Sequence, residues 1–467
     1  MAEQSTEKGW ALFKQALEGS STVDYTQGSI ARATFLLAVP MIIEMAMESI
    51  FAIVDIFFVA GVGTEAVATV GLTEAVITLL YAIAMGLAMG TTALVARRIG
   101  EKNREAAAIA ATQALWLAAF ISIAVGVNGI LFGEEILRLM GAEPAVIETG
   151  KAYTTIMFGS SFTIFFLFLI NAIFRGAGDA SLAMRTLVLA NGINIVLDPC
   201  LIYGVGPFPE LGVTGAAVAT NIGRGCGVAY GLYYLFFGEN RIQLGRAYAV
   251  FRASVLWSIL RISFGGVAQM LIATASWVFL MRIVSEFGGS AVAGYTIAVR
   301  IMLFIILPAF GLSNAAATLV GQNLGARLPE RAEATVWKVM EYVSYYMLAT
   351  AALALLLDEQ LISLFSTEPE VVTYGIACLQ IFSYGLIFFG ISATSVQAFN
   401  GAGDTMIPTW INFFSFWIVQ VPLAYTLALT LNMGPEGVFW AVFVSDVLAG
   451  ILGVLIFRRG RWKEKLV

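Results

Sequence analysis

The heptapeptide FRGAGDA at residues 174–180 returns as FNGAGDT at residues 399–405, and this repetition decides how the chain is organised. The second aspartate lies 225 positions after the first, and the same spacing aligns other residues without a gap: Gly86 with Gly311, Gly100 with Gly325, Glu105 with Glu330 and Gly150 with Gly375. Small apolar repeats arise by chance in membrane helices. However, the loop sequences AEPAVIETG (142–150) and TEPEVVTYG (367–375) match as well. The chain is therefore predicted to contain two copies of one unit.

The composition points to a membrane protein. Hydrophobic residues make up 59% of the 467 residues, charged residues make up 12%, and the mean hydropathy is +0.85, which is too apolar for a soluble domain. A helix needs roughly 20 mostly apolar residues to cross a bilayer, and twelve such segments are predicted. They are residues 30–60, 67–95, 105–132, 147–174, 182–203, 215–237, 253–284, 291–319, 332–357, 371–399, 406–431 and 437–457.

Six helices in each copy give both copies the same orientation in the membrane. The predicted fold is an all-α polytopic membrane protein with twelve transmembrane helices in two parallel-repeat, six-helix lobes. The predicted domains are an N-terminal segment (1–29), an N-terminal lobe (30–240), an inter-lobe linker (241–252), a C-terminal lobe (253–457) and a basic tail (458–467). Within the N-terminal segment, WALFKQALEG (10–19) has the spacing of an interfacial helix.

The basic residues predict the orientation, because Lys and Arg near span ends mark cytoplasmic loops. They gather after the second span, in the linker, after the eighth span and in the tail: Arg97, Arg98, Lys102, Arg104, Arg241, Arg246, Arg252, Arg327, Arg331, Arg458, Arg459, Arg461, Lys463 and Lys465. Both termini are therefore predicted to be cytoplasmic, and the protein is expected to be a multi-pass protein of the plasma membrane and a monomer.

The residue types present exclude several kinds of chemistry. The chain has no histidine and three widely separated cysteines, so neither a zinc cluster nor a disulfide framework is indicated. There is no GxxxxGK[ST] loop and no basic face for nucleic acid. The sequence therefore predicts no enzyme, no cofactor and no nucleic-acid partner, and proton chemistry would have to use carboxylates.

Carboxylates inside the predicted spans are the candidate functional groups. Glu44, Glu48 and Asp55 fall on one face of the first span at about 100° per residue. In the fifth span, Asn191, Asn194 and Asp198 lie within an arc of about 60°, and Pro199 behind the acid can loosen that turn. An acid at a helix centre costs at least about 2.5 kcal/mol on insertion. No Lys or Arg lies in the middle of either span, which indicates a functional role for the acids.

The second copy does not repeat these acids. At the 225-residue spacing Asp55 corresponds to Leu280 and Glu44 to Gln269, while Asp198 falls near Val421 and Pro422. The C-terminal lobe is thus expected to keep the architecture without the acids, and ion coupling is predicted in the N-terminal lobe.

The twelve spans, NIVLDP (194–199), GAAVAT (215–220) and TLVGQNLGA (318–326) resemble the multidrug and toxic compound extrusion (MATE) family over residues 30–457. The resemblance implies a secondary active antiporter that exports organic, often cationic, lipophilic compounds in exchange for protons or sodium ions by alternating access. Asp55 and Asp198 match the paired aspartates of the DinF-like branch. Asn194, Asn171 and Tyr153 fall where that branch has supporting polar residues. Acids of the seventh and tenth spans, which another branch uses, are missing here.

Two positions depart from the family pattern: Glu48 stands where related sequences often have glutamine, and Phe51 where tyrosine is common. The extra acid is expected to alter proton stoichiometry or to favour cationic substrates. The candidate coupling residues are Asp55, Asp198, Asn194, Asn171, Tyr153 and Glu48, with sodium possible at Asp55, Asp198 and Asn194. The candidate substrate-binding residues are Glu44, Glu48, Phe51, Met47, Met157 and Asn171. Protons and sodium stay open as the coupling ion.

Two other transport functions stay open as alternatives. A lipid-linked oligosaccharide flippase of the same superfamily would need several basic residues for a pyrophosphate, and Arg282 and Arg300 are few for that purpose. A passive channel would show flux without coupling to an ion gradient. The expected partners are small organic molecules and the lipid bilayer.

Overall fold

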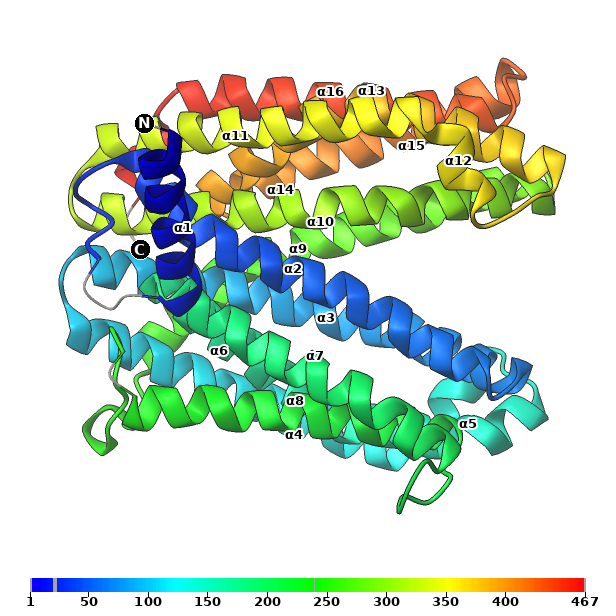
Figure 1. Cartoon of the computed structure of the whole chain (residues 1–467), viewed down its shortest axis with the longest axis horizontal. Helices are drawn as coiled ribbons and strands as arrows, with labels where there is room; N and C mark the ends of the chain where they lie inside the picture. The colour runs from blue at the N-terminus through cyan, green and yellow to red at the C-terminus, as the bar shows by residue number, and fades with distance from the viewer. Residues whose placement is uncertain (1, 20–22, 239, 466–467) are drawn as a thin grey trace.

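The computed structural model describes residues 2–19, 23–238 and 240–465. Residues 1 and 20–22 of the predicted N-terminal segment lie outside the described residues, as do Glu239 at the end of the predicted N-terminal lobe and residues 466–467 of the predicted tail. The described chain is a bundle of long helices, which form twelve transmembrane segments in two lobes (Figure 1).

Every predicted span contains a helix. The N-terminal half comprises α1 (Ala2–Glu18), α2 (Ile30–Ala60), α3 (Thr64–Gly100), α4 (Arg104–Leu139), α5 (Pro144–Gly159), α6 (Phe162–Ala177), α7 (Ala180–Tyr203) and α8 (Val213–Phe237). After the short η1 (Arg246–Tyr248), the C-terminal half comprises α9 (Ala253–Ser285), α10 (Gly289–Gly325), α11 (Pro329–Leu356), α12 (Asp358–Ser363), α13 (Pro369–Gly401), α14 (Met406–Asn412), η2 (Phe413–Gln420), α15 (Val421–Tyr425), η3 (Thr426–Thr430), α16 (Pro435–Arg458) and η4 (Arg461–Glu464).

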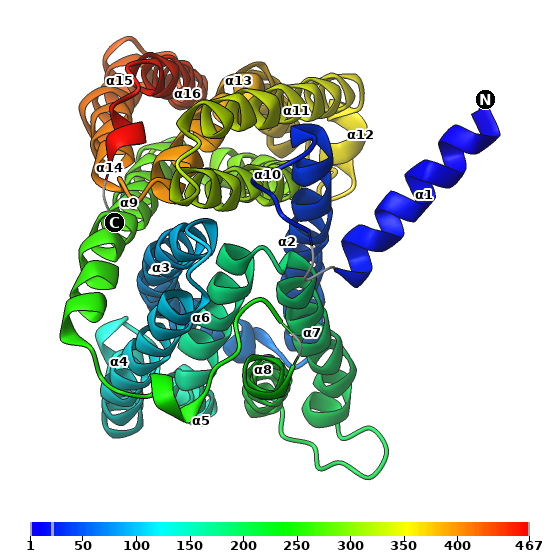
Figure 2. The same cartoon turned by 90° about the vertical axis from the view of Figure 1, so that its left-hand side faces the viewer.

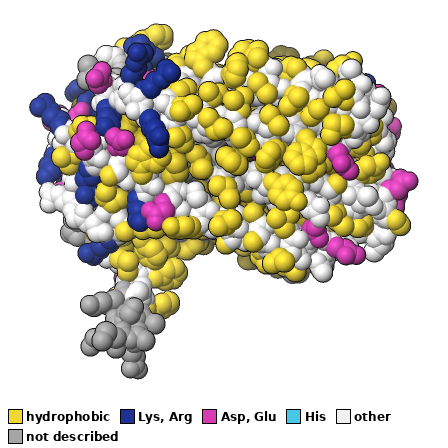
Figure 3. Space-filling model, turned by 90° about the horizontal axis from the view of Figure 1, so that it is seen from above, with side chains coloured by type: hydrophobic (Ala, Val, Ile, Leu, Met, Phe, Trp, Pro, Cys, Tyr) yellow, Lys and Arg dark blue, Asp and Glu magenta, His cyan; other side chains and the backbone are white. Residues whose placement is uncertain are grey.

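In the described chain, ten of the transmembrane segments are both long enough and apolar enough to cross a membrane. In this count α5–α6 is one segment and α14–η3 is another. The other two segments are α2 and α8, of 31 and 25 residues, which carry charged residues in their interiors. Figure 3 shows a broad hydrophobic band between the two ends of the molecule, as a bilayer requires.

The sequence predicted the fourth span as one segment, residues 147–174. In the structure this span breaks into two helices, α5 and α6. Ser160 leaves helical backbone geometry, and its hydroxyl donates to the carbonyl of Ile156. The Ser161 hydroxyl donates instead to the carbonyl of Ser122 on α4, at 3.2 Å. Serine side chains compete with the backbone for hydrogen bonds, so this pair interrupts the helix. By contrast, Pro199 lies inside α7, which continues to Tyr203.

Close contacts between the lobes reveal a pseudo-twofold axis. Gly86 of α3 packs against the backbone of Val267 on α9, and Gly311 of α10 packs against the backbone of Ile42 on α2. Neither glycine leaves room for a side chain. At the 225-residue spacing, Gly86 corresponds to Gly311 and Ile42 to Val267, so the two contacts are copies of each other. Such reciprocal pairing is what twofold symmetry produces.

A second reciprocal pair lies where α3 and α10 end. Gly100 packs against the carbonyl of Gln322, and Gly325 packs against the carbonyl of Arg97. These residues also exchange places at the 225-residue spacing. The two lobes are thus parallel repeats that meet through α2, α3, α9 and α10.

The ends of the bundle differ in charge. We call the end that carries both termini the basic end; its surface holds Arg98, Lys102, Arg104, Arg327 and Arg331. Figure 3 shows Lys and Arg gathered there, while Asp and Glu predominate at the opposite, acidic end. In Figure 1 the two lobes converge at the basic end and diverge toward the acidic end.

The repeated heptapeptide forms the same turn in each lobe, between α6 and α7 and between α13 and α14. Gly178 and Gly403, which are equivalent in the repeat, adopt φ values of +87° and +80°. Glycine reaches this left-handed conformation without the steric cost that other residues meet. The first turn is also held by the other lobe, because Thr318 and Gln322 of α10 donate to the carbonyls of Arg175 and Gly176, both at 3.0 Å.

Each turn binds the segment that follows the last helix of its own lobe. Asp179 pairs with Arg241, which follows α8, and Asp404 pairs with Lys465, which follows α16; both N–O distances are 3.2 Å. The guanidinium of Arg241 also covers the ring of Tyr25, 4.7 Å from its centroid. The turn, the linker and the N-terminal segment are thus joined at one buried point.

The N-terminal helix α1 extends sideways from the basic end (Figure 2). Its C-terminal end is anchored by Arg185 of α7, whose Nη2 donates to the carbonyls of Leu17 and Glu18 at 2.9 and 2.7 Å. Trp10 is 69% exposed and stacks on Phe13. An interfacial position for this helix stays a prediction.

Substitution of Asp179 by Asn tests the buried ion pair. Burial raises the pKa of Asp179 to about 6 from 3.8, against the opposing influence of Arg241. A carboxyl with a raised folded-state pKa contributes most to stability below about pH 4, and this contribution is lost as the pH rises through 6. In detergent, the unfolding free energy of the wild type minus that of Asp179→Asn should fall by on the order of 2–3 kcal/mol between pH 4 and pH 6.5.

Both proteins share all other titrating groups, so their difference isolates this carboxyl. A difference that grows with pH would show that attraction to Arg241 outweighs burial and would contradict the prediction.

Candidate functional site: buried charges in the N-terminal lobe

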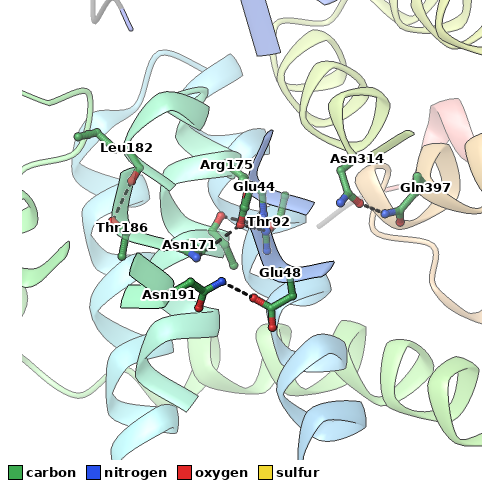
Figure 4. Close-up of polar contacts among 11 residues, drawn as sticks. Glu44, Glu48, Thr92, Asn171, Arg175, Leu182, Thr186, Asn191, Asn314 and Gln397 are labelled. Atoms are coloured by element: carbon green, nitrogen blue, oxygen red, sulfur yellow. Dashed lines mark hydrogen bonds and ion pairs between the residues drawn. The ribbon is translucent and has the colours of Figure 1, made fainter. Parts of the chain in front are cut away.

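Glu44 and Arg175 form a buried ion pair between α2 and α6 (Figure 4). Nη1 of Arg175 donates to Oε1 of Glu44 at 2.8 Å, and the Nδ2 of Asn171 lies 3.5 Å from the same oxygen. Glu44 is only 2% exposed. The sequence argument looked for basic residues only in the first and fifth spans and found none there. For Glu44 its conclusion is wrong, because the partner, Arg175, comes from the fourth span and belongs to the first heptapeptide.

The C-terminal lobe has an uncharged version of this pair. Nε2 of Gln269 donates to Oδ1 of Asn400 at 3.1 Å, and both residues are fully buried. At the 225-residue spacing, Gln269 corresponds to Glu44 and Asn400 to Arg175. Inside the heptapeptide the two copies differ only at Arg175 and Asn400, and the partner residue changes with them. The N-terminal lobe pairs a guanidinium with a carboxylate, and the C-terminal lobe pairs two amides.

Glu48 lies one turn from Glu44 and is partly exposed. Its Oε2 accepts a hydrogen bond from Nδ2 of Asn191 on α7 at 3.1 Å (Figure 4). No ion pair of Glu48 is found within 4.0 Å among the described residues, so solvent can reach a carboxyl group that no basic side chain pairs with directly.

Asp198 is fully buried and is held by polar side chains of α7 and α8. Nδ2 of Asn194 donates to Oδ1 of Asp198 at 3.2 Å and lies 3.0 Å from Oγ1 of Thr220. Thr220 was not predicted as a site residue, although it ends the GAAVAT motif. The other lobe repeats the bond between Asn194 and Thr220 as one from Gln420 to Ser445, at 2.8 Å.

Asp55 of α2 is 8% exposed and lies close enough to Asp198 for their charges to interact. Three buried oxygen atoms of this group have no hydrogen-bond partner in the described structure: Oδ1 of Asp55, Oδ2 of Asp198 and Oδ1 of Asn194. Buried acceptors are nearly always satisfied in native proteins. Three such oxygens therefore leave this polar group with unused acceptors.

The remaining predicted residues lie around this group. Tyr153 is 3% exposed, and the charge of Asp55 acts on its hydroxyl. Met47 and Phe51 are partly exposed on α2. Met157 is buried and packs in the core of the lobe with its sulfur 3.7 Å from Nδ2 of Asn221, so the structure does not bring it together with Glu44 and Glu48.

Charged residues that the sequence reading missed also lie here. Arg224 of α8 donates to the hydroxyl of Tyr81 on α3, and Glu74 of α3 is close enough to Asp55 and Arg224 for their charges to interact. Both charges lie inside predicted spans, so the criterion that identified the acids of the first span could have found them. The same holds for Asp446 of α16, which shows that the C-terminal spans do carry an acid, although α9 has none and the only acid of α13, Glu370, lies in its first turn.

The described part of the chain contains no group of three or more Asp, Glu or Cys side chains arranged to hold a metal ion.

The two repeated lobes and the buried ionisable groups on one side of their interface define a secondary transporter. A family model described as MatE matches residues 40–200 and matches again over residues 267–426, once in each lobe. The chain belongs to the MatE family.

Named relatives are similar over nearly the full length. The chain is 26% identical over 458 residues to "Probable multidrug resistance protein NorM" of Thermotoga maritima, covering 98% of this chain and 97% of that protein. It is 26% identical to "Probable multidrug resistance protein YoeA" of Bacillus subtilis, covering 94% and 96%. A solved structure described as the outward-facing conformation of a multidrug resistance MATE family transporter has a TM-score of 0.89 at 28% identity, covering 96% and 99%.

The ion pair between Glu44 and Arg175 can be tested by copying the other lobe. Glu44→Gln leaves the guanidinium of Arg175 buried without a counter-charge, which should lower stability by on the order of 3–5 kcal/mol. The double variant Glu44→Gln/Arg175→Asn recreates the amide pair of Gln269 and Asn400 and should regain most of that loss. Thermal unfolding in detergent measures both. A double variant as unstable as the single one would show that the pairing is not what stabilises this position.

Proposed function

We propose that this protein is a secondary active multidrug efflux antiporter that exports organic, lipophilic, often cationic compounds in exchange for protons or sodium ions. Its membership of the MatE family and the names of its relatives support the transport of drugs. The three unsatisfied buried oxygens of Asp55, Asp198 and Asn194 carry the proposal of ion coupling. No resident cofactor is needed, because the driving ion is a co-substrate.

The orientation follows from the charges at the two ends. Lys and Arg gather at the basic end (Figure 3), which supports a cytoplasmic location for that end and for both termini. We propose that the protein is a monomer in the plasma membrane. Its lobes, residues 30–240 and 253–457, would be joined by the linker 241–252.

Two carboxylates close together in apolar surroundings cannot both stay charged without cost. A proton on one of them, or a sodium ion between Asp55, Asp198 and Asn194, removes the repulsion. Asp55 lies on α2 and Asp198 on α7, so binding of the ion draws these helices together and its release lets them separate. Tyr153 and Thr220 border the pair and limit the access of water.

Alternating access requires the interlobe contacts at the basic end to open. In the conformation described, Gly100 and Gly325 are closed against the other lobe, and Thr318 and Gln322 hold the first repeated turn. The likeness to an outward-facing transporter fits this closed basic end. Rocking of the lobes about the pseudo-twofold axis would open it.

The proposed substrate contact is Glu48, supported by Met47 and Phe51. Glu44 is neutralised by Arg175, so we now assign it and Asn171 to the support of this arginine. Glu48 has no ion-pair partner within 4.0 Å among the described residues, is partly exposed, and is oriented by Asn191. A flexible thioether and an aromatic ring beside a carboxylate suit lipophilic cations of various shapes.

A flippase for pyrophosphate-linked lipids is less well supported. Such a substrate needs free cationic side chains between the lobes. The buried arginines of the N-terminal lobe are instead engaged, Arg175 by Glu44 and Arg224 by Tyr81.

Transport of a fluorescent cationic dye in proteoliposomes, under separately imposed pH and sodium gradients, tests the function. The wild type should accumulate or expel the dye against its gradient with one of these ions. Asp55→Asn and Asp198→Asn should each reduce gradient-driven transport at least tenfold, because an amide can neither exchange a proton nor neutralise a cation. Asp446→Asn is the matched control, an acid of the other lobe, and should stay within about twofold of the wild type.

Equal dye flux with and without an ion gradient would indicate a passive channel. Full activity of either aspartate variant would remove the proposed coupling site even if the protein is a transporter.

A further inference from the structure

Arg224 is a buried cation inside the proposed ion site, and the function described so far does not use it. It is the single Lys or Arg of α8, is 8% exposed, and lies one turn from Thr220 on the same helix. Nη2 donates to the hydroxyl of Tyr81, and the guanidinium lies 5.6 Å from the centroid of that ring. Nη1 is buried and has no hydrogen-bond partner in the described chain. The Nη2 side of the guanidinium is therefore fixed by Tyr81, whereas the Nη1 side has no hydrogen-bond partner in the described chain.

Acidic groups face Arg224 from three helices. Glu48 and Asp55 act on it from α2, and Glu74 acts from α3. Asp198 of α7 lies beside Asp55. The hydroxyls of Tyr81 on α3 and Tyr153 on α5 complete the titratable groups around it. The arginine is connected to the coupling group through Thr220, one turn away on α8, which bonds Asn194, the partner of Asp198.

No ion pair joins Arg224 to any of these acids within 4.0 Å in the described structure, and Oδ1 of Asp55 is likewise without a partner. A full ion pair would neutralise Asp55, as Arg175 neutralises Glu44. The guanidinium thus keeps a positive charge that no carboxylate of the described chain neutralises by direct pairing. The corresponding position of the C-terminal lobe is Ala449, so this device belongs to the lobe with the acids.

We propose that Arg224 is a positioning residue that sets how tightly the site holds its cation. Resting on the proposed function, the inference explains how the ion is released. Two carboxylates in a medium of low dielectric constant attract a cation strongly, and a site that binds too tightly cannot turn over. The fixed guanidinium repels the mobile cation and so weakens its binding to the carboxylates. The hydrogen bond to Tyr81 keeps the guanidinium in place.

Equilibrium binding in detergent tests this proposal independently of transport. Sodium binding is measured by calorimetry at constant ionic strength with choline as the replacement ion, and ethidium binding is measured by fluorescence. Arg224→Met and Arg224→Gln remove the charge and should bind at least one of these cations on the order of tenfold more tightly. Arg224→Lys keeps the charge and should remain within about threefold of the wild type. Arg224→Gln also retains a polar group toward Tyr81, in case the methionine variant does not fold.

The same variants are then compared in proteoliposomes. The neutral variants should show a lower KM for the dye together with a lower kcat, because the ion is released more slowly, while the lysine variant should retain both. A purely structural role for Arg224 predicts lower activity without tighter binding, and that result would overturn the proposal. Tighter binding in the neutral variants, with no gradient-driven transport in the wild type, would support the role of Arg224 and reject antiport.

Discussion

Charge buried away from water has to be matched by an opposite charge, by hydrogen bonds or by a mobile ion, and this constraint orders the N-terminal lobe. The lobe shows all three solutions along α2. Glu44 has a permanent partner in Arg175, Glu48 is held by an amide and reaches solvent, and Asp55 has an oxygen that nothing in the described chain satisfies. Oε2 of Glu44 is unsatisfied as well, but the charge of Glu44 is balanced by Arg175, which is why the coupling site is proposed at Asp55 and not at Glu44.

The two lobes show what that constraint adds to a common scaffold. Their reciprocal glycine contacts and repeated turns superpose at one spacing along the chain, and the polar pair Asn194–Thr220 recurs as Gln420–Ser445 with one residue of drift. Where the N-terminal lobe has Glu44 and Arg175, the C-terminal lobe has Gln269 and Asn400 in the same relation. Hydrogen-bonded amides hold the helices together without electrostatic cost. The C-terminal lobe thus holds this position with neutral groups, while the N-terminal lobe retains the charged groups to which the proposed function assigns ion coupling.

Sequence reasoning recovered the architecture because its signals are strong: long apolar segments, one fixed repeat spacing, and glycine turns. It found the acids of α2 and α7 because charges are rare inside apolar spans. It did not find the pairing of Glu44, since helix periodicity gives the face of a residue but not the neighbouring helix that supplies its partner. Arg224, Glu74 and Asp446 carried the same signal and were overlooked. The break at Ser160 and Ser161 depends on a hydrogen bond to α4, which no local pattern contains.

The ion pairs of Asp179 and Asp404 bear on how such a molecule could arise. Each is closed by a residue that follows the last helix of the same lobe, so either half of the chain supplies the ion pair of its own turn, while the other lobe adds hydrogen bonds to the first turn. A gene encoding half of this protein would already specify a finished unit, and the reciprocal glycine contacts would let two of these units associate as a homodimer. Fusion would then have required little more than a connecting segment, after which each half was free to diverge in charge.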